Sequence, residues 1–121
     1  MTDDTLLLRQ INPAFVQNAR VSSQAFRPTP KDQYKLSVYN GDLITAEQSW
    51  KHFVAKGLKS IGVLAVNVRE CTAEGLPSYS SPEVFEQHAH IDFSNLTEGQ
   101  IKGKGKRLLA VAIIRGWLHH A

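Results

Sequence analysis

An unbroken apolar run, SIGVLAVNV at residues 60–68, constrains the fold more than any other stretch of the sequence. Hydrophobic side chains occupy neighbouring positions, so both faces of an extended strand here are apolar: Ile61, Val63, Leu64, Ala65, Val66 and Val68. Strands of this kind are typically covered on both sides by other elements. The run therefore predicts the central core strand of a sheet that is covered on both faces.

The segment TAEQSWKHFVAKG, residues 45–57, predicts a helix just before this strand. Thr45 is the expected N-cap, Gln48 its capping-box partner, and Gly57 the left-handed residue after the last turn. Apolar side chains recur at helical spacing on one face, namely Ala46, Trp50, Phe53 and Val54. We expect this face to bury its two aromatic side chains against the sheet.

A second main helix is expected between residues 97 and 115. Thr97 and Gln100 form another capping-box pair, and Gly116 ends the segment. Two glycines near the beginning, Gly103 and Gly105, each cost roughly 1 kcal/mol relative to alanine in a helix interior. The first part is therefore expected to be partly loop, with firm helix from Lys106.

Three further strands are predicted, at residues 5–11, 34–40 and 88–93. Together with the helices they predict an α+β fold with a single domain over residues 1–121, built as a mixed sheet of about four strands with two main helices packed on it. One right-handed parallel crossover is expected to join the strands at 34–40 and 60–68.

The composition of the chain indicates the cellular compartment in which the protein is expected. A single cysteine, Cys71, rules out an internal disulfide and a multi-cysteine zinc site, and fits a reducing cytoplasm. The acidic start is unlike a signal peptide, and the longest apolar run, residues 108–114, is shorter than the ~20 residues that span a bilayer. A cytoplasmic protein without a membrane span is expected.

The net charge of +3 favours acidic partners, but it is a weaker signal than the dense basic stripe of a dedicated nucleic-acid binder.

The motif HAHIDF comes closest to a chemical signature. On a strand, His88, His90 and Asp92 share one face, and the alternate apolar residues face the core. These three side chains are the candidate catalytic residues, and the two histidines are the candidate metal ligands, because imidazoles at this spacing can hold zinc or iron.

A metal site would need further ligands, and no spacing points to any of the candidates: His52, Cys71, His119, His120 or a glutamate. The polar face of an ordinary strand is the favoured interpretation of HAHIDF. We therefore expect neither a metal nor a cofactor.

Two groups of residues are candidates for holding an anion. Ser22 and Ser23, with Arg9, Arg20 and Arg27 nearby, could form an anion pocket if the early strands adjoin HAHIDF, although no GxSxG motif marks either serine as a nucleophile. The segment GKGKR lacks the spacing of a phosphate-binding loop. The segment and the residue before it still form a local cluster of four cations that could bind phosphates non-specifically, namely Lys102, Lys104, Lys106 and Arg107.

The stretches LLRQINP, SSQAFRPTPKD, LSVYNGDLITAE and HAHIDF together resemble a group of small stand-alone bacterial proteins, often from mobile or accessory gene neighbourhoods. The resemblance covers most of the chain and implies a bacterial accessory role. It brings no established activity and no catalytic residue.

Three functional hypotheses follow from the sequence. The first is an interaction module that binds a protein or an acidic ligand through the proline-containing loop and the basic segment. The second is a small enzyme that uses His88, His90, Asp92 and a nearby arginine on a phosphate-containing substrate. The third, resting on charge alone, is non-specific nucleic-acid binding. The oligomeric state is left open, and a dimer is compatible with the sequence.

Overall fold

A six-stranded antiparallel sheet forms the centre of the computed structural model, which describes all 121 residues. The strands are β1 Leu6–Gln10, β2 Val16–Gln17, β3 Arg20–Val21, β4 Lys35–Asn40, β5 Gly62–Asn67, β6 Ser78–Ser80, β7 His88–Asp92 and β8 His119–His120. The helices are α1 Ala46–Ala55, α2 Val68–Ala73 and α3 Glu98–Arg115, with three 3-10 turns, η1 Pro13–Phe15, η2 Ser23–Phe26 and η3 Pro30–Asp32.

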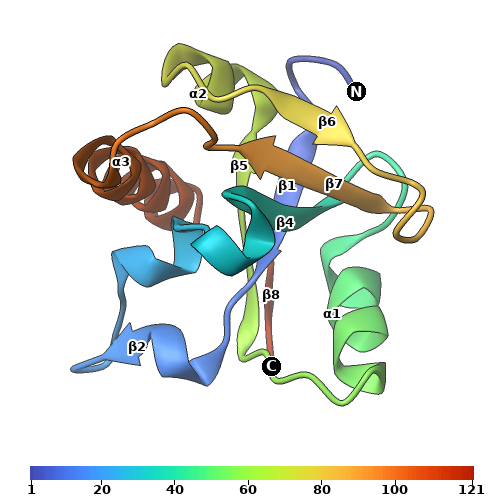
Figure 1. The fold of residues 1–121 in the computed structure, drawn as a ribbon. Helices are drawn as coiled ribbons and strands as arrows, with labels where there is room; N and C mark the ends of the chain where they lie inside the picture. The colour runs from blue at the N-terminus through green and yellow to red at the C-terminus, as the bar shows by residue number, and fades with distance from the viewer.

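Six strands form the sheet in the order β6-β7-β4-β1-β5-β8, and β2 pairs with β3 in a separate hairpin. Figure 1 shows the sheet between α3 on one side and α1 on the other. The protein is thus a single α+β domain, but the expected mixed sheet of about four strands with two main helices is wrong. The sheet has six strands, every neighbouring pair is antiparallel, and there are three α-helices.

The error in topology has a definite cause. β4 and β5 both run antiparallel to β1, so they point the same way and α1 connects them, as expected for a crossover. They are not neighbours, however, because β1 lies between them and pairs with both. The error in strand number arises because β6 and β8 are only three and two residues long.

Both faces of β5 are covered, which confirms the prediction from its apolar run. Leu64 and Val66 join the larger core, which contains residues of α3, α2 and η2. Val63 and Ala65 point to the other face and join a smaller core against α1. The HAHIDF strand, β7, places Ala89 and other apolar residues in the larger core, so its polar residues lie on the α1 side of the sheet.

Helix α1 begins and ends as predicted. Thr45 and Gln48 make the reciprocal capping-box hydrogen bonds, and Gly57 has a φ of +83°. The expected burial is wrong in degree, because Trp50 and Phe53 pack on the smaller core but stay partly exposed. The indole N–H of Trp50 donates to the carbonyl of Ser60 at 2.9 Å.

Helix α3 is continuous from Glu98, so the expected loop before Lys106 is wrong. Gly105 faces η2 across a close contact, where an added Cβ would lie 2.7 Å from Cγ of Arg27 and 3.1 Å from the carbonyl oxygen of Phe26. The glycine therefore lets helix and turn approach, and the gain in packing offsets its low helix propensity. No helix in the structure combines the length and hydropathy needed to cross a membrane.

Candidate ligand-binding site

The sheet opens at one end between β1 and β4. The two strands pair at Leu7 with Asn40 and at Leu8 with Tyr39, and no further. Beyond this point the side chain of Arg9 spans the gap: its Nη1 donates to the carbonyl of Ser37 at 2.9 Å and its Nε to the carbonyl of Ala25 at 2.6 Å. The guanidinium thus bonds backbone carbonyls of β4 and η2 where strand pairing has ended.

A cavity of about 480 Å³ lies at this opening, and we call it the arginine pocket. It is lined by residues from β1, η1, η2, η3, β4, α3 and the segment that joins η2 to η3: Arg9, Ala14, Phe15, Gln24, Arg27, Pro28, Thr29, Pro30, Asp32, Leu36, Ser37, Glu98 and Ile101. Its volume falls within the ~300–1,000 Å³ of typical small-molecule sites. Segments distant in sequence therefore converge on one concave site that contains two arginines.

Arg9 is a half-buried cation without an ion-pair partner. None of the four ion pairs in the structure includes Arg9 or Arg27. Burial lowers the pKa of Arg9 to about 10, with a smaller opposing effect from the nearby charge of Asp32. The guanidinium still carries its charge at neutral pH, 5.6 Å from the ring centroid of Phe15. A desolvated cation without a paired carboxylate is a favourable place for an anion.

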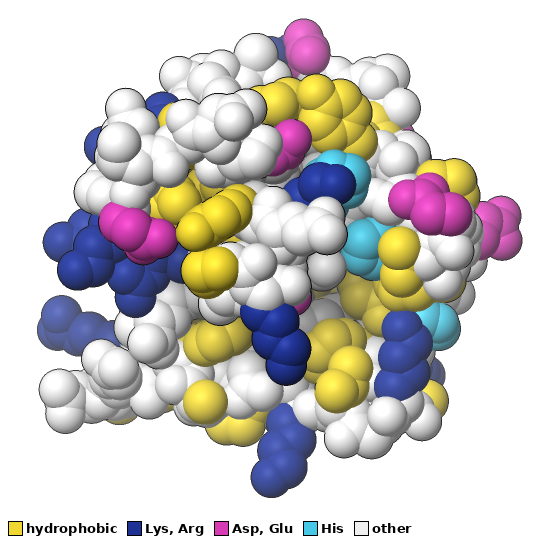
Figure 2. Space-filling model, in the orientation of Figure 1, with side chains coloured by type: hydrophobic (Ala, Val, Ile, Leu, Met, Phe, Trp, Pro, Cys, Tyr) yellow, Lys and Arg dark blue, Asp and Glu magenta, His cyan; other side chains and the backbone are white.

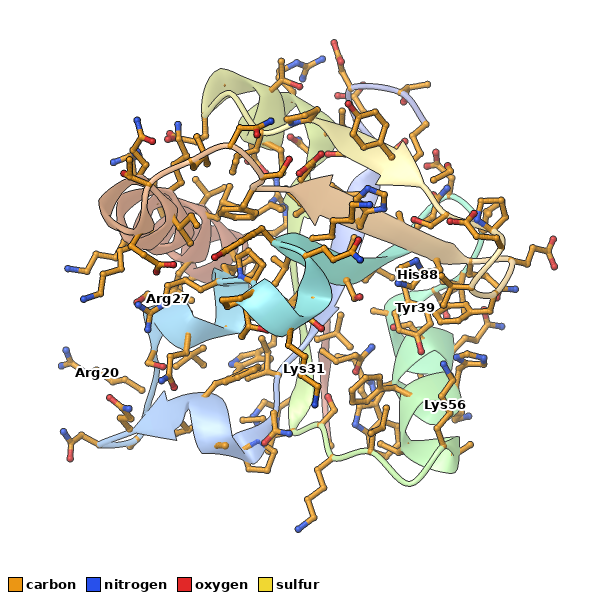
Figure 3. All side chains as sticks on the ribbon, viewed as in Figure 1. Arg20, Arg27, Lys31, Tyr39, Lys56 and His88 are labelled. Carbon is orange, nitrogen blue, oxygen red and sulfur yellow. The ribbon has the colours of Figure 1, made fainter.

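The pocket also presents acidic and neutral polar groups. The carboxylates of Asp32 and Glu98 line it with Thr29, whose hydroxyl donates to Oδ2 of Asp32 at 3.0 Å. Arg27, which Figure 3 labels on the η2 side of the molecule, has its stem against Gly105 of α3. The site therefore offers two guanidinium groups for an anion and two carboxylates for hydrogen-bond donors.

The structure brings together only part of the predicted anion group. Arg9 and Arg27 line the same pocket, whereas Arg20, Ser22 and Ser23 do not. The hydroxyl of Ser22 is buried without a hydrogen-bond partner, and its backbone N–H donates to the carbonyl of Phe15 at 2.7 Å. The condition attached to that pocket, that the early strands adjoin HAHIDF, is not met, because β4 separates β1 from β7.

The HAHIDF side chains bond to neighbouring residues on their own face of the sheet. Nε2 of His88 lies 3.2 Å from the hydroxyl of Ser37, and Nδ1 of His90 lies 2.7 Å from the hydroxyl of Ser81. Burial lowers the pKa of both imidazoles, with further contributions from neighbouring charges. The carboxylate of Asp92 accepts a hydrogen bond from the N–H of Ser94, the neighbour whose hydrogen bonds lower its pKa.

The other residues considered as metal ligands are dispersed. His52 lies on α1 with Nδ1 2.7 Å from the Tyr39 hydroxyl, and His119 and His120 form β8 at the far edge of the sheet. Cys71 is the buried residue of α2, and burial raises the pKa of its thiol to about 12. No group of three or more His, Cys, Asp or Glu side chains is arranged to hold a metal ion.

The basic segment is part of α3, and its cations do not act as one group. Glu74 accepts from two of them: its carbonyl from Nζ of Lys104, and its carboxylate from Nε of Arg107 at 2.6 Å. Lys102 and Lys106 are exposed. The four residues predicted to grip phosphates are thus divided between a contact with the end of α2 and open solvent.

No family model matches the chain, and neither a curated protein nor a solved structure matches it. The resemblance to small bacterial accessory proteins therefore stays an expectation from the sequence.

Proposed function

We propose that the protein is a small binding module for an acidic ligand, a small molecule with a phosphate or carboxylate group that binds in the arginine pocket. The observation that carries this proposal is the half-buried guanidinium of Arg9, which has no ion-pair partner. Leaving a charge in a partly dehydrated site without a counter-ion costs free energy, which an arriving anion would recover.

The donor count at Arg9 indicates how the anion would be held. A guanidinium has five N–H donors, and two of them bond the carbonyls of Ala25 and Ser37. The remaining donors, on Nη1 and Nη2, have no protein acceptor, and they can bind two oxygens of one phosphate or carboxylate together. Arg27 lines the same pocket without an ion-pair partner and would supply the second positive charge.

The carboxylates of the pocket narrow the class of ligand. Asp32 and Glu98 repel a ligand whose charge is spread over its whole length, but they accept hydrogen bonds from hydroxyl or amino groups. The best-fitting ligand therefore has one anionic group and several donors, as a sugar phosphate or an amino acid does. A polyanion such as nucleic acid fits the site less well.

The remaining hypotheses from the sequence stay hypotheses. They are a protein partner, catalysis by His88, His90 and Asp92 on a phosphate-containing substrate, and binding of nucleic acid. A cytoplasmic location agrees with a chain whose single thiol is buried.

Thermal unfolding with inorganic phosphate and glycerol 3-phosphate tests the proposal. A ligand that binds only the folded state at ten times its dissociation constant adds about 1.4 kcal/mol, or about 5 °C in Tm for a chain of this size. Glycerol 3-phosphate should give the larger shift, because its hydroxyls can reach the acidic residues.

The variants Arg9→Gln and Arg27→Gln should lose most of this shift. Arg20→Gln is the matched control: it removes the same charge from an exposed arginine of β3 that does not line the pocket (Figure 3). An equal loss in all three variants would mean that the anions respond only to net charge, and the proposal would be wrong.

A further inference from the structure

A second cavity, of about 220 Å³, lies on the α1 side of the sheet, and we call it the aromatic pocket. Arg9 and Ser37 line both cavities, so the two pockets adjoin at the opening of the sheet. In Figure 3 the labelled Tyr39 and His88 lie together above the labelled Lys56, and Figure 2 shows a hollow with hydrophobic side chains at its floor in the same region.

The wall of this pocket is an aromatic cluster centred on Phe85. Its ring centroid lies 5.2 Å from that of Tyr39, 5.0 Å from that of His88 and 4.8 Å from that of His52. Nζ of Lys56 lies 4.0 Å from the same centroid. Contacts from several sides hold the Phe85 ring in place, so the wall is arranged before any ligand arrives.

Apolar side chains at the mouth of the pocket are left in solvent. Leu58 is 48% exposed and Val84 is 60% exposed, although both line the cavity. Phe53 of α1 lines it as well. An apolar guest seated between these side chains would remove their surface from water, which favours binding.

Two polar groups could orient such a guest. The ammonium group of Lys56 contacts the Phe85 ring but makes no ion pair, so it can still pair with an anion. Nδ1 of His88 is buried without a hydrogen-bond partner, while Nε2 contacts Ser37. The hydroxyl of Tyr39 is already engaged with His52, and burial raises the pKa of Tyr39 to about 12, so it stays uncharged.

We propose that the aromatic pocket binds a small aromatic carboxylate, with its ring against Phe85 and Phe53 and its carboxylate at Lys56 and His88. The volume is below that of a typical drug-sized site and suits a single ring with a short acidic group. This binding goes beyond the proposed function, because it uses a different cavity, a different cation and an apolar contact that the arginine pocket does not require.

Titration of the full chain with benzoate, followed in amide and histidine NMR spectra, tests this proposal. Benzoate should shift the signals of His88 and of residues 53–58 and 84–88 in a saturable way. Two comparison ligands separate the contributions: benzyl alcohol has the ring without the charge, and cyclohexanecarboxylate has the charge without the aromatic ring. Each should bind about tenfold more weakly than benzoate.

Lys56→Gln should weaken benzoate binding about tenfold, as expected for the loss of a charge-assisted hydrogen bond. Lys51→Gln is the matched control on the same helix, since Lys51 is exposed, pairs with Glu47 and does not line the pocket. Phe85→Leu should also weaken benzoate binding. Because Lys56 is exposed, the Lys56→Gln variant should fold normally, so it tests the proposal even if the Phe85→Leu variant unfolds.

Three results would overturn the inference: no saturable shift near His88, equal weakening in both lysine variants, or benzyl alcohol binding as tightly as benzoate. A parallel titration with glycerol 3-phosphate, read at the arginine pocket, keeps this outcome separate from the proposed function. Loss of benzoate binding with phosphate binding intact would reject the aromatic pocket alone.

Discussion

Two glycines of α3 make a matched pair that tests how the arginine pocket is built. Replacing either by alanine in a helix interior should recover about 0.8–1.0 kcal/mol of helix propensity. At Gly103 an added Cβ meets only the end of the Arg107 side chain, at 3.4 Å, which can move aside. Gly103→Ala should therefore stabilise the protein by about 0.5–1 kcal/mol.

At Gly105 the added Cβ would lie 2.7 Å from Cγ of Arg27 and 3.1 Å from the backbone oxygen of Phe26, and neither can yield without moving η2. Overpacking of this kind costs about 1–3 kcal/mol, which exceeds the gain in propensity. Because both alanines gain the same helix propensity, we expect Gly105→Ala to be less stable than Gly103→Ala by the overpacking cost, about 1–3 kcal/mol, or about 4–12 °C in Tm.

Calorimetric and urea unfolding of both variants measure this difference. A second measurement connects it to the site: because Arg27 is displaced, Gly105→Ala should bind glycerol 3-phosphate more weakly than wild type, while Gly103→Ala should bind it equally well. Equal stabilisation by the two alanines would show that α3 does not press on η2, and the account of how Arg27 is held would be refuted.

Three further expectations concern the rest of the fold. Burial raises the pKa of Glu70, but hydrogen bonds from Arg115 and from the N–H of Asn67, with the Arg115 charge, outweigh this effect, so the pKa is lowered overall. The contribution of Glu70 to stability should therefore be present above pH ~4.3 and be lost as the pH falls through the lowered pKa. Unfolding of wild type and Glu70→Gln across pH 2–7 checks this, and a constant difference between them would contradict it. The thiol of Cys71, buried and with its pKa raised to about 12, should react with a thiol reagent only after unfolding, so rapid labelling of the native protein at pH 8 would exclude the packing described. Trp50→Ala should cost about 3 kcal/mol, at the low end for a large aromatic because Trp50 is partly exposed, and a thermal melt showing less than 1 kcal/mol would remove the contact between α1 and the sheet.

The parts of the fold that the sequence predicts are those whose signals lie within a few neighbouring residues. The capping box at Thr45 and Gln48 and the two-sided apolar run of β5 belong to this class. The place of β1 does not, because it is decided by pairing of Leu7 with Asn40 on one side and with Val66 on the other. No local pattern records which distant strand inserts between two others.

The candidate site likewise has residues that the sequence predicts and residues that only tertiary packing brings to it. Sequence reasoning selected Arg9 and Arg27 as anion-binding candidates, and the structure places both on one pocket. It missed Gln24, Asp32 and Glu98, which reach the pocket from η2, η3 and α3 only through tertiary packing. The sequence signal that could have indicated this packing is Gly105, because a glycine is unfavourable in the interior of an otherwise well-capped helix.

The central claim, that the guanidinium of Arg9 binds the anionic group of a small ligand, is tested most directly by the NMR signal of its Nε–H group. During titration with glycerol 3-phosphate at fixed ionic strength, the signals of Arg9 and Arg27 should shift together along one saturable curve, while that of Arg20 stays unchanged. The Arg9 response should be strongly weakened in Arg27→Gln. If Arg9 does not shift, or if all three arginines drift in proportion to ligand concentration, the arginine pocket does not bind acidic ligands and the account is wrong.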